Sequence, residues 1–372
     1  MTGSPFLPQS GRSRRARALA RHKRRRRRIR ALALCALAIV AVGVAISLGL
    51  DRSTAHSSAS GAGKSTANGG PPKGAAARSG SSQAVATRSP TGLPLGRAPL
   101  ALDLSGTGDP VQIAFHNPPR AGLLFDLNSG RVLWQLNPLE HLHMASLTKM
   151  MTALRVVRAT TPDTPVLVTK EAVDAAGSKV GVLPLGKHVP AETMLYGLLL
   201  PSGNDAATAL AQHVSGSVSA FVDGMNSEAA RLGLGCTHYT SPSGYTNARN
   251  YTCAADLAEL AHVDLEQPRI AHIVRSSSAV LPFPIKGGKL YLYNNNPLLV
   301  YDYPGATGMK TGYTELAGDC LVATAERDGV SLGVVLLHSP ELGRQAESLL
   351  NAGFEQVYHQ RALPAPAVPV GR

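Results

Sequence analysis

Apolar segments with the pattern of β-strands stand at both ends of one long stretch of this chain, and helix-like segments lie between them. Ala121–Phe125 and Val132–Gln135 are separated by the turn sequence NSG, which predicts a β-hairpin. Cys320–Ala325 and Ser331–Leu337 are separated by ERDG, which predicts a second hairpin. Strands at both ends therefore favour one α/β domain whose sheet brings the ends together around a helical insert.

Apolar residues at helical spacing predict the helices of this domain. Five of them lie between the hairpins and one follows the second hairpin: Ser146–Arg158, Ala191–Leu200, Asp205–Val214, Phe221–Leu232, Ala254–Val263 and Leu342–Tyr358. A hydrophobic content of 44% is sufficient for a core and excludes a wholly disordered chain.

The N-terminal region combines a basic segment with an apolar one. Residues 1–30 carry 12 Lys and Arg and no acidic residue, and residues 31–50 carry no charge at all. At about 1.5 Å per residue, a helix over 31–50 would be about 30 Å long, the thickness of the hydrocarbon core. We therefore expect a single-pass transmembrane helix that contacts membrane lipid, with a cytoplasmic N-terminus and an extracytoplasmic remainder. A cleaved signal peptide is the alternative.

The net charge of +13 does not indicate a nucleic-acid partner. Of the 37 Lys and Arg, 25 lie beyond residue 30, where they face 24 Asp and Glu. The body of the chain is thus nearly neutral and predicts no phosphate-binding surface. Residues 51–96 are dominated by small and polar residues and predict a disordered linker. We expect residues 97–361 to form the folded domain and residues 362–372 a loose Pro-rich tail.

The four cysteines leave one pairing open. Cys35 lies in the apolar segment, and Cys320 lies in an apolar run where a buried thiol is expected. Cys236 and Cys253 are 17 positions apart, in a part of the chain expected to be extracytoplasmic. A disulfide between them is compatible with that compartment, but sequence does not fix connectivity. No metal site is predicted: the cysteine spacing does not resemble a zinc site, and His141 and His143 lack a third clustered ligand.

Three short motifs follow one another in order. Ser146 to Lys149 is S-x-x-K, Ser202-Gly203-Asn204 stands 56 positions after Ser146, and Lys310-Thr311-Gly312 comes 108 positions after that. Each motif alone is more often structural than catalytic. Together they form the signature known from β-lactamases and penicillin-binding proteins.

The residue types in the motifs suit nucleophilic catalysis. Positions i and i+3 share a helix face, so Lys149 can reach the Ser146 hydroxyl. Lysine accepts a proton near neutral pH only if its pKa is lowered, which burial and a second cation such as Lys310 both promote. Gly312 lacks a side chain and would let a substrate backbone approach a strand edge.

The chain from about Ala121 to Phe354 resembles the low-molecular-mass penicillin-binding proteins, the serine D-alanyl-D-alanine carboxypeptidase family. The resemblance rests on Ala145–Leu154, Leu200–Ala207 and Gly308–Thr314, and on the connecting segments Leu232–Leu234, Ser243–Tyr245 and Ala317–Val322. It implies a β-lactamase-like, D,D-peptidase-like α/β fold, in which helices flank a mainly antiparallel sheet and a helical subdomain is present.

The resemblance also implies a role for each motif residue and requires no cofactor and no metal. The roles are a nucleophile (Ser146), its base (Lys149), a proton relay (Ser202), a substrate-amide ligand (Asn204), a carboxylate-binding strand (Lys310, Thr311 and Gly312) and the backbone N–H groups of an oxyanion hole (Ser146 and Tyr313).

The function implied is removal of the terminal D-alanine from peptidoglycan pentapeptide stems, with β-lactam antibiotics as covalent inhibitors. A D,D-endopeptidase or transpeptidase would use the same chemistry. A β-lactamase is disfavoured, because Gly203 stands where that class has Asp and no Glu-x-x-Leu-Asn stretch separates Asn204 from Lys310. The non-enzymatic alternative is a membrane-tethered wall-binding scaffold.

Overall fold

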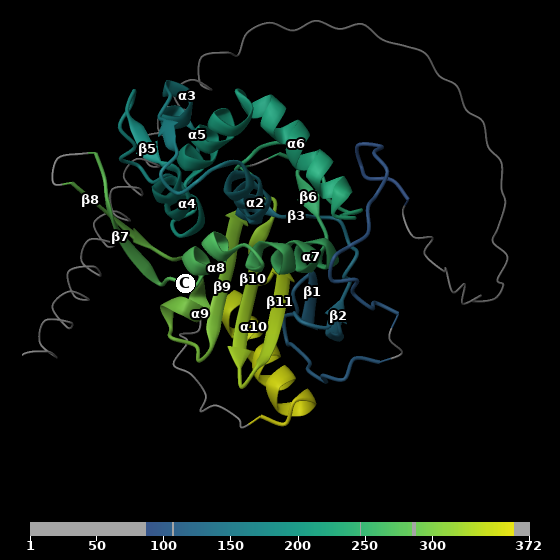
Figure 1. The fold of residues 1–372 in the computed structure, drawn as a ribbon. Helices are drawn as coiled ribbons and strands as arrows, with labels where there is room; N and C mark the ends of the chain where they lie inside the picture. The colour runs from purple at the N-terminus through teal and green to yellow at the C-terminus, as the bar shows by residue number, and fades with distance from the viewer. Residues whose placement is uncertain (1–86, 106–107, 246, 285–287, 361–372) are drawn as a thin grey trace, which may run out of the picture. The chain divides into compact units, whose positions relative to one another are not determined.

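A five-stranded antiparallel sheet is central to the part of the chain that the computed structural model describes, residues 87–105, 108–245, 247–284 and 288–360 (Figure 1). The strand order is β2-β1-β11-β10-β9. The strands are β1 (Ala121–Asp126), β2 (Val132–Leu136), β9 (Ala306–Thr314), β10 (Gly318–Arg327) and β11 (Val330–Leu337). Because β1 pairs with β11, the two predicted hairpins join into one sheet, as expected from strands at both ends.

Both faces of this sheet are covered by helices. Leu123 and Phe125 of β1 lie in the larger apolar cluster, which also contains side chains of α7 (Ala254–Leu265). Leu124 lies in a second cluster together with side chains of α10 (Leu342–Ala352). Successive residues of a strand point to opposite faces, so β1 is buried throughout.

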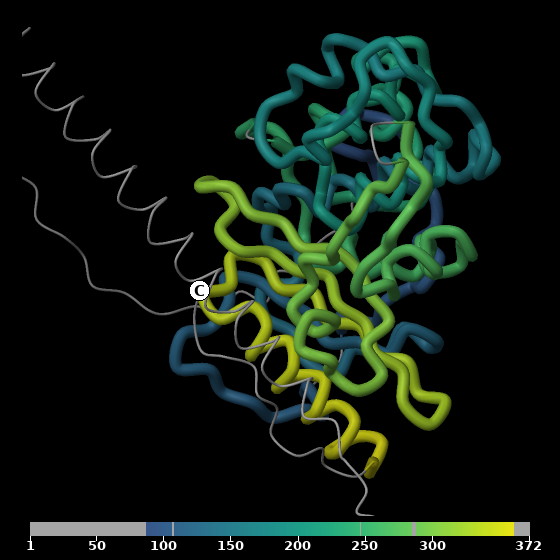
Figure 2. The backbone as a smooth tube through the Cα atoms, turned by 90° about the vertical axis from the view of Figure 1, so that its left-hand side faces the viewer, coloured from purple at the N-terminus to yellow at the C-terminus, as the bar shows by residue number. Residues whose placement is uncertain are grey.

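A helical subdomain, drawn at the top of Figures 1 and 2, is inserted between the two hairpins. Its small sheet pairs two short strands, β4 (Pro165–Leu167) and β5 (His188–Pro190). Its helices are α2 (Lys149–Ala159), α3 (Lys170–Asp174), α4 (Ala191–Leu199), α5 (Asn204–Ser215) and α6 (Val218–Arg231). The expected α/β fold with an antiparallel sheet and helices is therefore confirmed.

Several elements differ from the sequence-based expectation. The helix expected from Ser146 begins only at Lys149, after a 3₁₀ turn, η1 (Ala145–Thr148). The last helix ends at Ala352 and continues as a π-helical turn, η2 (Gly353–Val357). The strand β9, which carries the lysine-threonine-glycine motif, was not among the strands predicted from apolar runs.

Other elements were not predicted at all. Among them are the short strands β3 (Leu142–His143) and β6 (Tyr251–Thr252), the helices α8 (Pro268–Val274) and α9 (Pro297–Val300), and the hairpin of β7 (Ser278–Pro282) and β8 (Lys289–Tyr293). Strands of two residues are too short for periodicity to be visible.

Contacts with the domain begin before residue 97. The Gly96 N–H donates to the Ala230 carbonyl at 2.8 Å, and the Leu100 N–H donates to the buried Glu259 carboxyl at 2.7 Å. Among the residues described, no helix combines the length and the apolar character needed to cross a bilayer. The segments 1–30, 31–50 and 362–372, and most of the linker expected over 51–96, lie outside the described residues.

Candidate active site

The turn that carries Ser146 is enclosed by two glycines. Ala145 adopts φ +47°, a left-handed conformation that is strained for a residue with a side chain. A Cβ at Gly244 would lie 1.9 Å from the Ala145 carbonyl oxygen, and one at Gly312 would lie 3.0 Å from the Ser146 nitrogen. The space left by Gly312 is thus occupied by the turn that carries Ser146, whereas the sequence led us to assign it to the substrate.

Lys149 is the centre of the hydrogen-bond network. It is fully buried at the start of α2, and its Nζ donates to Ser146 Oγ at 2.9 Å, Asn204 Oδ1 at 2.7 Å and the Ser243 carbonyl at 2.9 Å. An ammonium has three protons, so these acceptors use all of them. A neutral amine would keep two donors for Asn204 and Ser243 and direct its lone pair at the Ser146 hydroxyl.

The electrostatic environment favours that neutral amine. Burial lowers the pKa of Lys149 well below its ordinary value of 10.5, the positive charge of Lys310 lowers it further, and Asp205 opposes both effects. Burial also lowers the pKa of Lys310, to about 7. Two buried amines therefore lose protons far more readily than surface lysines do.

The first turn of α5 binds the loop between α3 and β5. Asn204 Nδ2 donates to the Ala176 carbonyl at 2.6 Å, while the Asp205 carboxylate accepts from the N–H groups of Val180 and Gly181 at 2.9 and 3.0 Å. Both ends of the Asn204 amide are thus engaged by the protein. In this state Asn204 orients Lys149, a role additional to the substrate contact expected from the sequence.

Ser202 lies in the connection between α4 and α5. Its φ of +67° is left-handed, and its buried hydroxyl has no hydrogen-bond partner among the described residues. A buried hydroxyl without a partner is unfavourable, so a bound molecule that supplies one would be stabilised there.

The strand β9 forms one edge of the five-stranded sheet and carries four of the expected site residues. Lys310 is buried, and its Nζ donates to the Thr311 carbonyl at 2.9 Å. Thr311 is half-buried, and the side chain of Tyr313 is 60% exposed. An edge strand offers unpaired backbone groups, which suits the binding of an extended peptide.

Some residues of the three motifs are in direct contact, and others are near one another only through charge or chain connection. Ser146, Lys149 and Asn204 are in direct contact, and Gly312 lies against the backbone of Ser146. Lys310 influences Lys149 through its charge. Ser202 is placed by its chain connection to Asn204, and Tyr313 by its connection to Gly312.

Sequence reasoning missed three contributors to the site. The Ser243 carbonyl accepts a hydrogen bond from Lys149, Gly244 leaves room for the turn that carries Ser146, and Asn250 Nδ2 donates to Thr148 Oγ1 at 2.9 Å. The segment Ser243–Tyr245 was noted only as a landmark of the resemblance. Backbone acceptors leave no residue-type signal, so only the glycine could have drawn attention to this loop.

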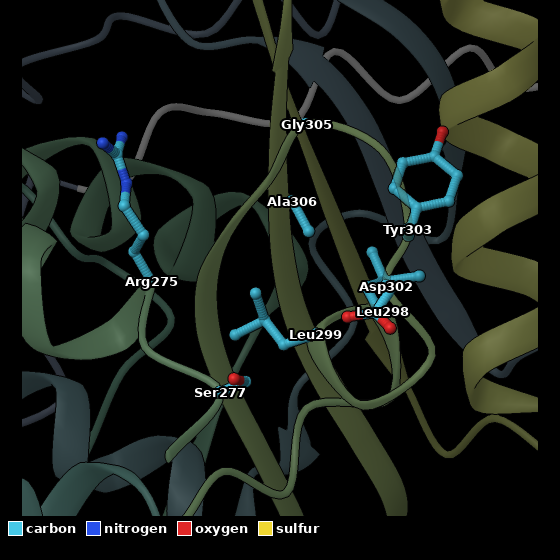
Figure 3. Close-up of a pocket in the computed structure, with 8 residues that line it drawn as sticks. All are labelled: Arg275, Ser277, Leu298, Leu299, Asp302, Tyr303, Gly305 and Ala306. Atoms are coloured by element: carbon cyan, nitrogen blue, oxygen red, sulfur yellow. The ribbon is translucent and has the colours of Figure 1, made fainter. Parts of the chain in front are cut away.

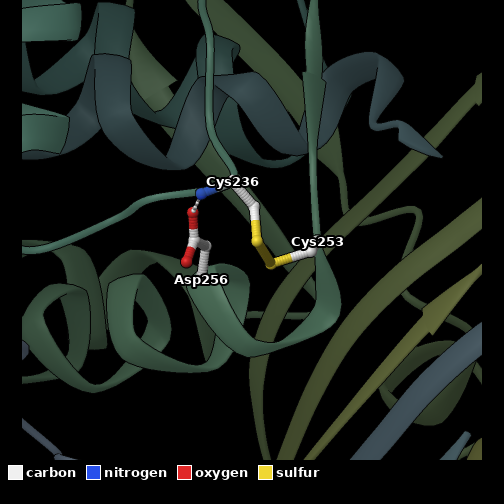
Figure 4. A group of neighbouring side chains, drawn as sticks. All are labelled: Cys236, Cys253 and Asp256. Atoms are coloured by element: carbon white, nitrogen blue, oxygen red, sulfur yellow. Dashed lines mark hydrogen bonds between the residues drawn. A yellow bond between two sulfur atoms is a disulfide. The ribbon is translucent and has the colours of Figure 1, made fainter. Parts of the chain in front are cut away.

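The structure contains a disulfide between Cys236 and Cys253, with Asp256 beside it (Figure 4). These three residues are the one group of closely spaced metal-ligand types among the described residues, and two of them are bonded to each other. Cys320 is a buried free thiol, and burial raises its pKa to about 12. His141 stacks on Tyr251 with ring centroids 5.3 Å apart.

A cavity of about 320 Å³ opens elsewhere, between the end of α8, α9 and the start of β9 (Figure 3). Arg275, Ser277, Leu299 and Ala306 are among the residues that line it. It contains no residue of the three motifs, so the candidate chemistry lies outside it.

The chain is similar to several known proteins. The sequence profile described as D-alanyl-D-alanine carboxypeptidase matches residues 116–341. The chain is 33% identical to the Bacillus subtilis D-alanyl-D-alanine carboxypeptidase DacF, over 64% of this chain and 62% of DacF. It is 34% identical to the Mycobacterium tuberculosis D-alanyl-D-alanine carboxypeptidase DacB2, over 64% of this chain and 82% of DacB2.

Among solved structures, a point mutant of the Streptomyces K15 DD-transpeptidase superimposes with a TM-score of 0.61 at 30% identity. The superposition covers 65% of this chain and 99% of that one. The chain therefore matches slightly less than two thirds of DacF but nearly all of the smaller transpeptidase.

Proposed function

The chain belongs to the D-alanyl-D-alanine carboxypeptidase family, and on that premise we propose that it removes the terminal D-alanine from peptidoglycan pentapeptide stems. The observation that carries the proposal is the 2.9 Å contact between Lys149 Nζ and Ser146 Oγ inside a buried, cation-rich pocket. A serine becomes a useful nucleophile only when a neighbour takes its proton, and a lysine of lowered pKa is such a neighbour.

The first step forms an ester. Neutral Lys149 takes the Ser146 proton while Oγ attacks the carbonyl carbon of the penultimate D-alanine. The backbone N–H groups of Ser146 and Tyr313 receive the oxyanion, each such donor contributing roughly 3–4 kcal/mol of barrier lowering. The proton then passes from Lys149 through the Ser202 hydroxyl to the nitrogen of the departing D-alanine, and the carbon–nitrogen bond breaks.

The second step hydrolyses the ester and regenerates the free enzyme. Lys149, neutral again, takes a proton from water as that water attacks the ester carbon. Lys149 then gives this proton to Ser146 Oγ as the ester bond breaks, so both side chains return to their starting forms. The product is a stem one residue shorter. Every group involved belongs to the chain or to the two substrates, and no cofactor takes part.

Preference for the chain end is assigned to β9. Lys310 is buried with one protein acceptor, so a substrate carboxylate beside it would raise its pKa and keep it charged. Thr311 would add a hydroxyl donor on the same strand. A charge-assisted pair in a dry site is strong, which favours a free carboxylate over an internal peptide bond.

The test is release of D-alanine from a pentapeptide-stem mimic by the full chain in detergent, with Ser146→Ala as the control. We expect release by the native chain only. Equal background rates from both would favour the scaffold alternative. Incubation with penicillin separates this function from that of a β-lactamase: a long-lived adduct on Ser146 is expected, and rapid turnover of a chromogenic β-lactam would contradict it.

Transpeptidation is the second candidate, favoured by the likeness to the Streptomyces K15 DD-transpeptidase. The acyl-enzyme is common to both reactions, and only the acceptor differs. Adding an amino acceptor to the stem-mimic assay distinguishes them: a carboxypeptidase yields mainly the shortened stem, whereas a transpeptidase yields mainly the amide.

We also propose that residues 31–50 anchor the protein in the cell membrane, with residues 1–30 cytoplasmic and the catalytic domain outside. Twenty uncharged residues beside 12 basic ones support this arrangement. Protease added to intact spheroplasts should digest the catalytic domain and leave a tag placed before residue 30 intact. Recovery of a soluble, shortened chain would instead indicate a cleaved signal peptide.

A further inference from the structure

The disulfide of Cys236 and Cys253 joins two segments that contact β3 and the turn that carries Ser146. Cys236 follows the end of α6, and Cys253 stands directly before α7, at its N-cap position. Both residues are buried, 17 positions apart, with Cα atoms 5.6 Å apart. Catalysis as proposed above does not use either sulfur, so the bond requires another explanation.

One arm of the disulfide leads to Ser146 through β6. Thr252 and Tyr251 of β6 pair with Leu142 and His143 of β3, and β3 continues into the turn that carries the nucleophile. Just before β6, Asn250 Nδ2 donates to Thr148 Oγ1 within that turn at 2.9 Å. The position of β6 therefore sets the position of the nucleophile turn from two sides.

The other arm places a third strand-like segment against β6. His238 exchanges two backbone hydrogen bonds with Tyr251, at 2.9 and 3.1 Å, and Thr237 Oγ1 lies 2.8 Å from Thr252 Oγ1. After Cys253, in the first turn of α7, the Ala255 N–H donates to the Pro138 carbonyl at 3.1 Å. The segment that leads into β3 is thus also held through α7.

The turn held in this way is strained. Ala145, between β3 and Ser146, has φ +47°, and a strained backbone persists only where its surroundings over-determine it. Two-residue strands alone supply few hydrogen bonds for that purpose. The covalent bond at the end of β6 adds a constraint to these hydrogen bonds.

We propose that the Cys236–Cys253 disulfide is a positioning element for the nucleophile turn, so that reduction slows acylation of Ser146 while the domain stays folded. The inference rests on the proposed acyl-enzyme chemistry. Loss of alignment between Ser146 Oγ and Lys149 Nζ should lower the acylation rate constant by about ten- to a hundredfold. Pre-covalent binding should change by less than about twofold, because β9 supplies it and does not touch the disulfide.

The experiment compares the full chain before and after reduction with tris(2-carboxyethyl)phosphine. Thiol labelling after unfolding should rise from two to all four cysteines. Acylation by a fluorescent penicillin, followed over a concentration series, separates the rate constant from the binding constant. Fluorescence of Trp134, the single tryptophan, reports folding from the sheet core away from the disulfide.

A Cys236→Ala/Cys253→Ala double variant provides the matched control. It should acylate at the rate of the reduced chain and show no response to the reductant. If the variant does not fold, the reduced native chain, measured while its Trp134 signal is unchanged, still decides the question.

Two outcomes would overturn the proposal: an unchanged acylation rate constant after complete reduction, or loss of activity only in step with the Trp134 signal. The second outcome would make the disulfide a support of global stability alone. An oxidised chain that never forms an adduct would instead refute the proposed function, so the two failures are distinguishable.

Discussion

Asn204 Oδ1 lies 2.7 Å from Lys149 Nζ, and this contact joins two residues of different motifs that stand 55 positions apart in the chain. The carbonyl end of a neutral amide accepts a hydrogen bond from the lysine without adding charge. It thus orients the amine while leaving intact the lowered pKa that burial and Lys310 produce. A neutral acceptor at this position is what a basic Lys149 requires.

Asn204→Asp should therefore impair acylation through charge. A carboxylate in contact with Lys149 favours its ammonium form, raises its pKa and removes the base at neutral pH. Each unit by which the pKa of Lys149 rises above the working pH lowers the fraction of neutral amine by about tenfold. Acylation by penicillin at pH 7 should fall and recover partly as the pH is raised. Asn204→Ala serves as the comparison: it should be slow without such recovery, and equal profiles for both variants would contradict the electrostatic account.

Lys310→Gln should remove the preference for a free carboxylate. Loss of one partner of a buried charge pair costs roughly 2–5 kcal/mol, so kcat/KM for a stem mimic should fall by about thirtyfold or more. The same mimic with an amidated C-terminus lacks the carboxylate and should be affected much less. The measurement is the ratio of the two kcat/KM values in each protein. An unchanged ratio in the variant would show that Lys310 does not bind the substrate terminus.

Gly312→Ala should displace the nucleophile turn. The added Cβ would lie 2.9 Å from the Met144 carbonyl oxygen and 3.0 Å from the Ser146 nitrogen, so strand and turn must separate. Such overpacking typically costs about 1–3 kcal/mol of stability, and acylation should slow more than that loss alone implies. Gly108→Ala is the matched control, because a Cβ there meets nothing within 4 Å. Native acylation kinetics in Gly312→Ala would contradict the packing argument.

Asp256 should make stability depend on pH. Burial raises its pKa from 3.8 to about 7, against hydrogen bonds from Thr237 and the Cys236 N–H that favour the ionised form. Above about pH 4 the unfolded chain releases this proton, whereas the folded chain keeps it until about pH 7. The free energy of unfolding should thus decrease as the pH rises through that window.

Asp256→Asn isolates this contribution. Both hydrogen bonds reach the same carboxylate oxygen, so an asparagine oxygen can accept both. The variant should be more stable than the native chain at pH 7, with little difference at pH 4, as measured by urea unfolding. A difference independent of pH would show that Asp256 does not titrate in this window.

The sequence predicted those parts of the fold that long periodic segments encode. The hairpins that became β1–β2 and β10–β11 have clear apolar runs and turns, and α4 to α7 have helical spacing. It did not predict the left-handed Ala145, the short pairing of β3 with β6, or the buried Glu259 that binds Leu100. Each of these depends on contacts between segments about 100 or more positions apart, which no local pattern records.

The candidate site likewise has one part that the sequence predicted and another that only the structure shows. The motifs identified the side chains that carry charge or a hydroxyl, because those residue types are scarce and ordered. The Ser243 carbonyl and the close approach of Gly244 are properties of the backbone, and they become visible only in the folded chain.

The proposed mechanism requires a neutral Lys149 acting as base on Ser146, and the pH dependence of acylation tests this directly. The rate constant for penicillin adduct formation, measured by intact mass from pH 5 to 10, should rise along a limb centred well below 10.5 and then level off. Peptide mapping should place the adduct on Ser146. A rate that still climbs steeply near pH 10, or an adduct on another residue, would contradict the mechanism.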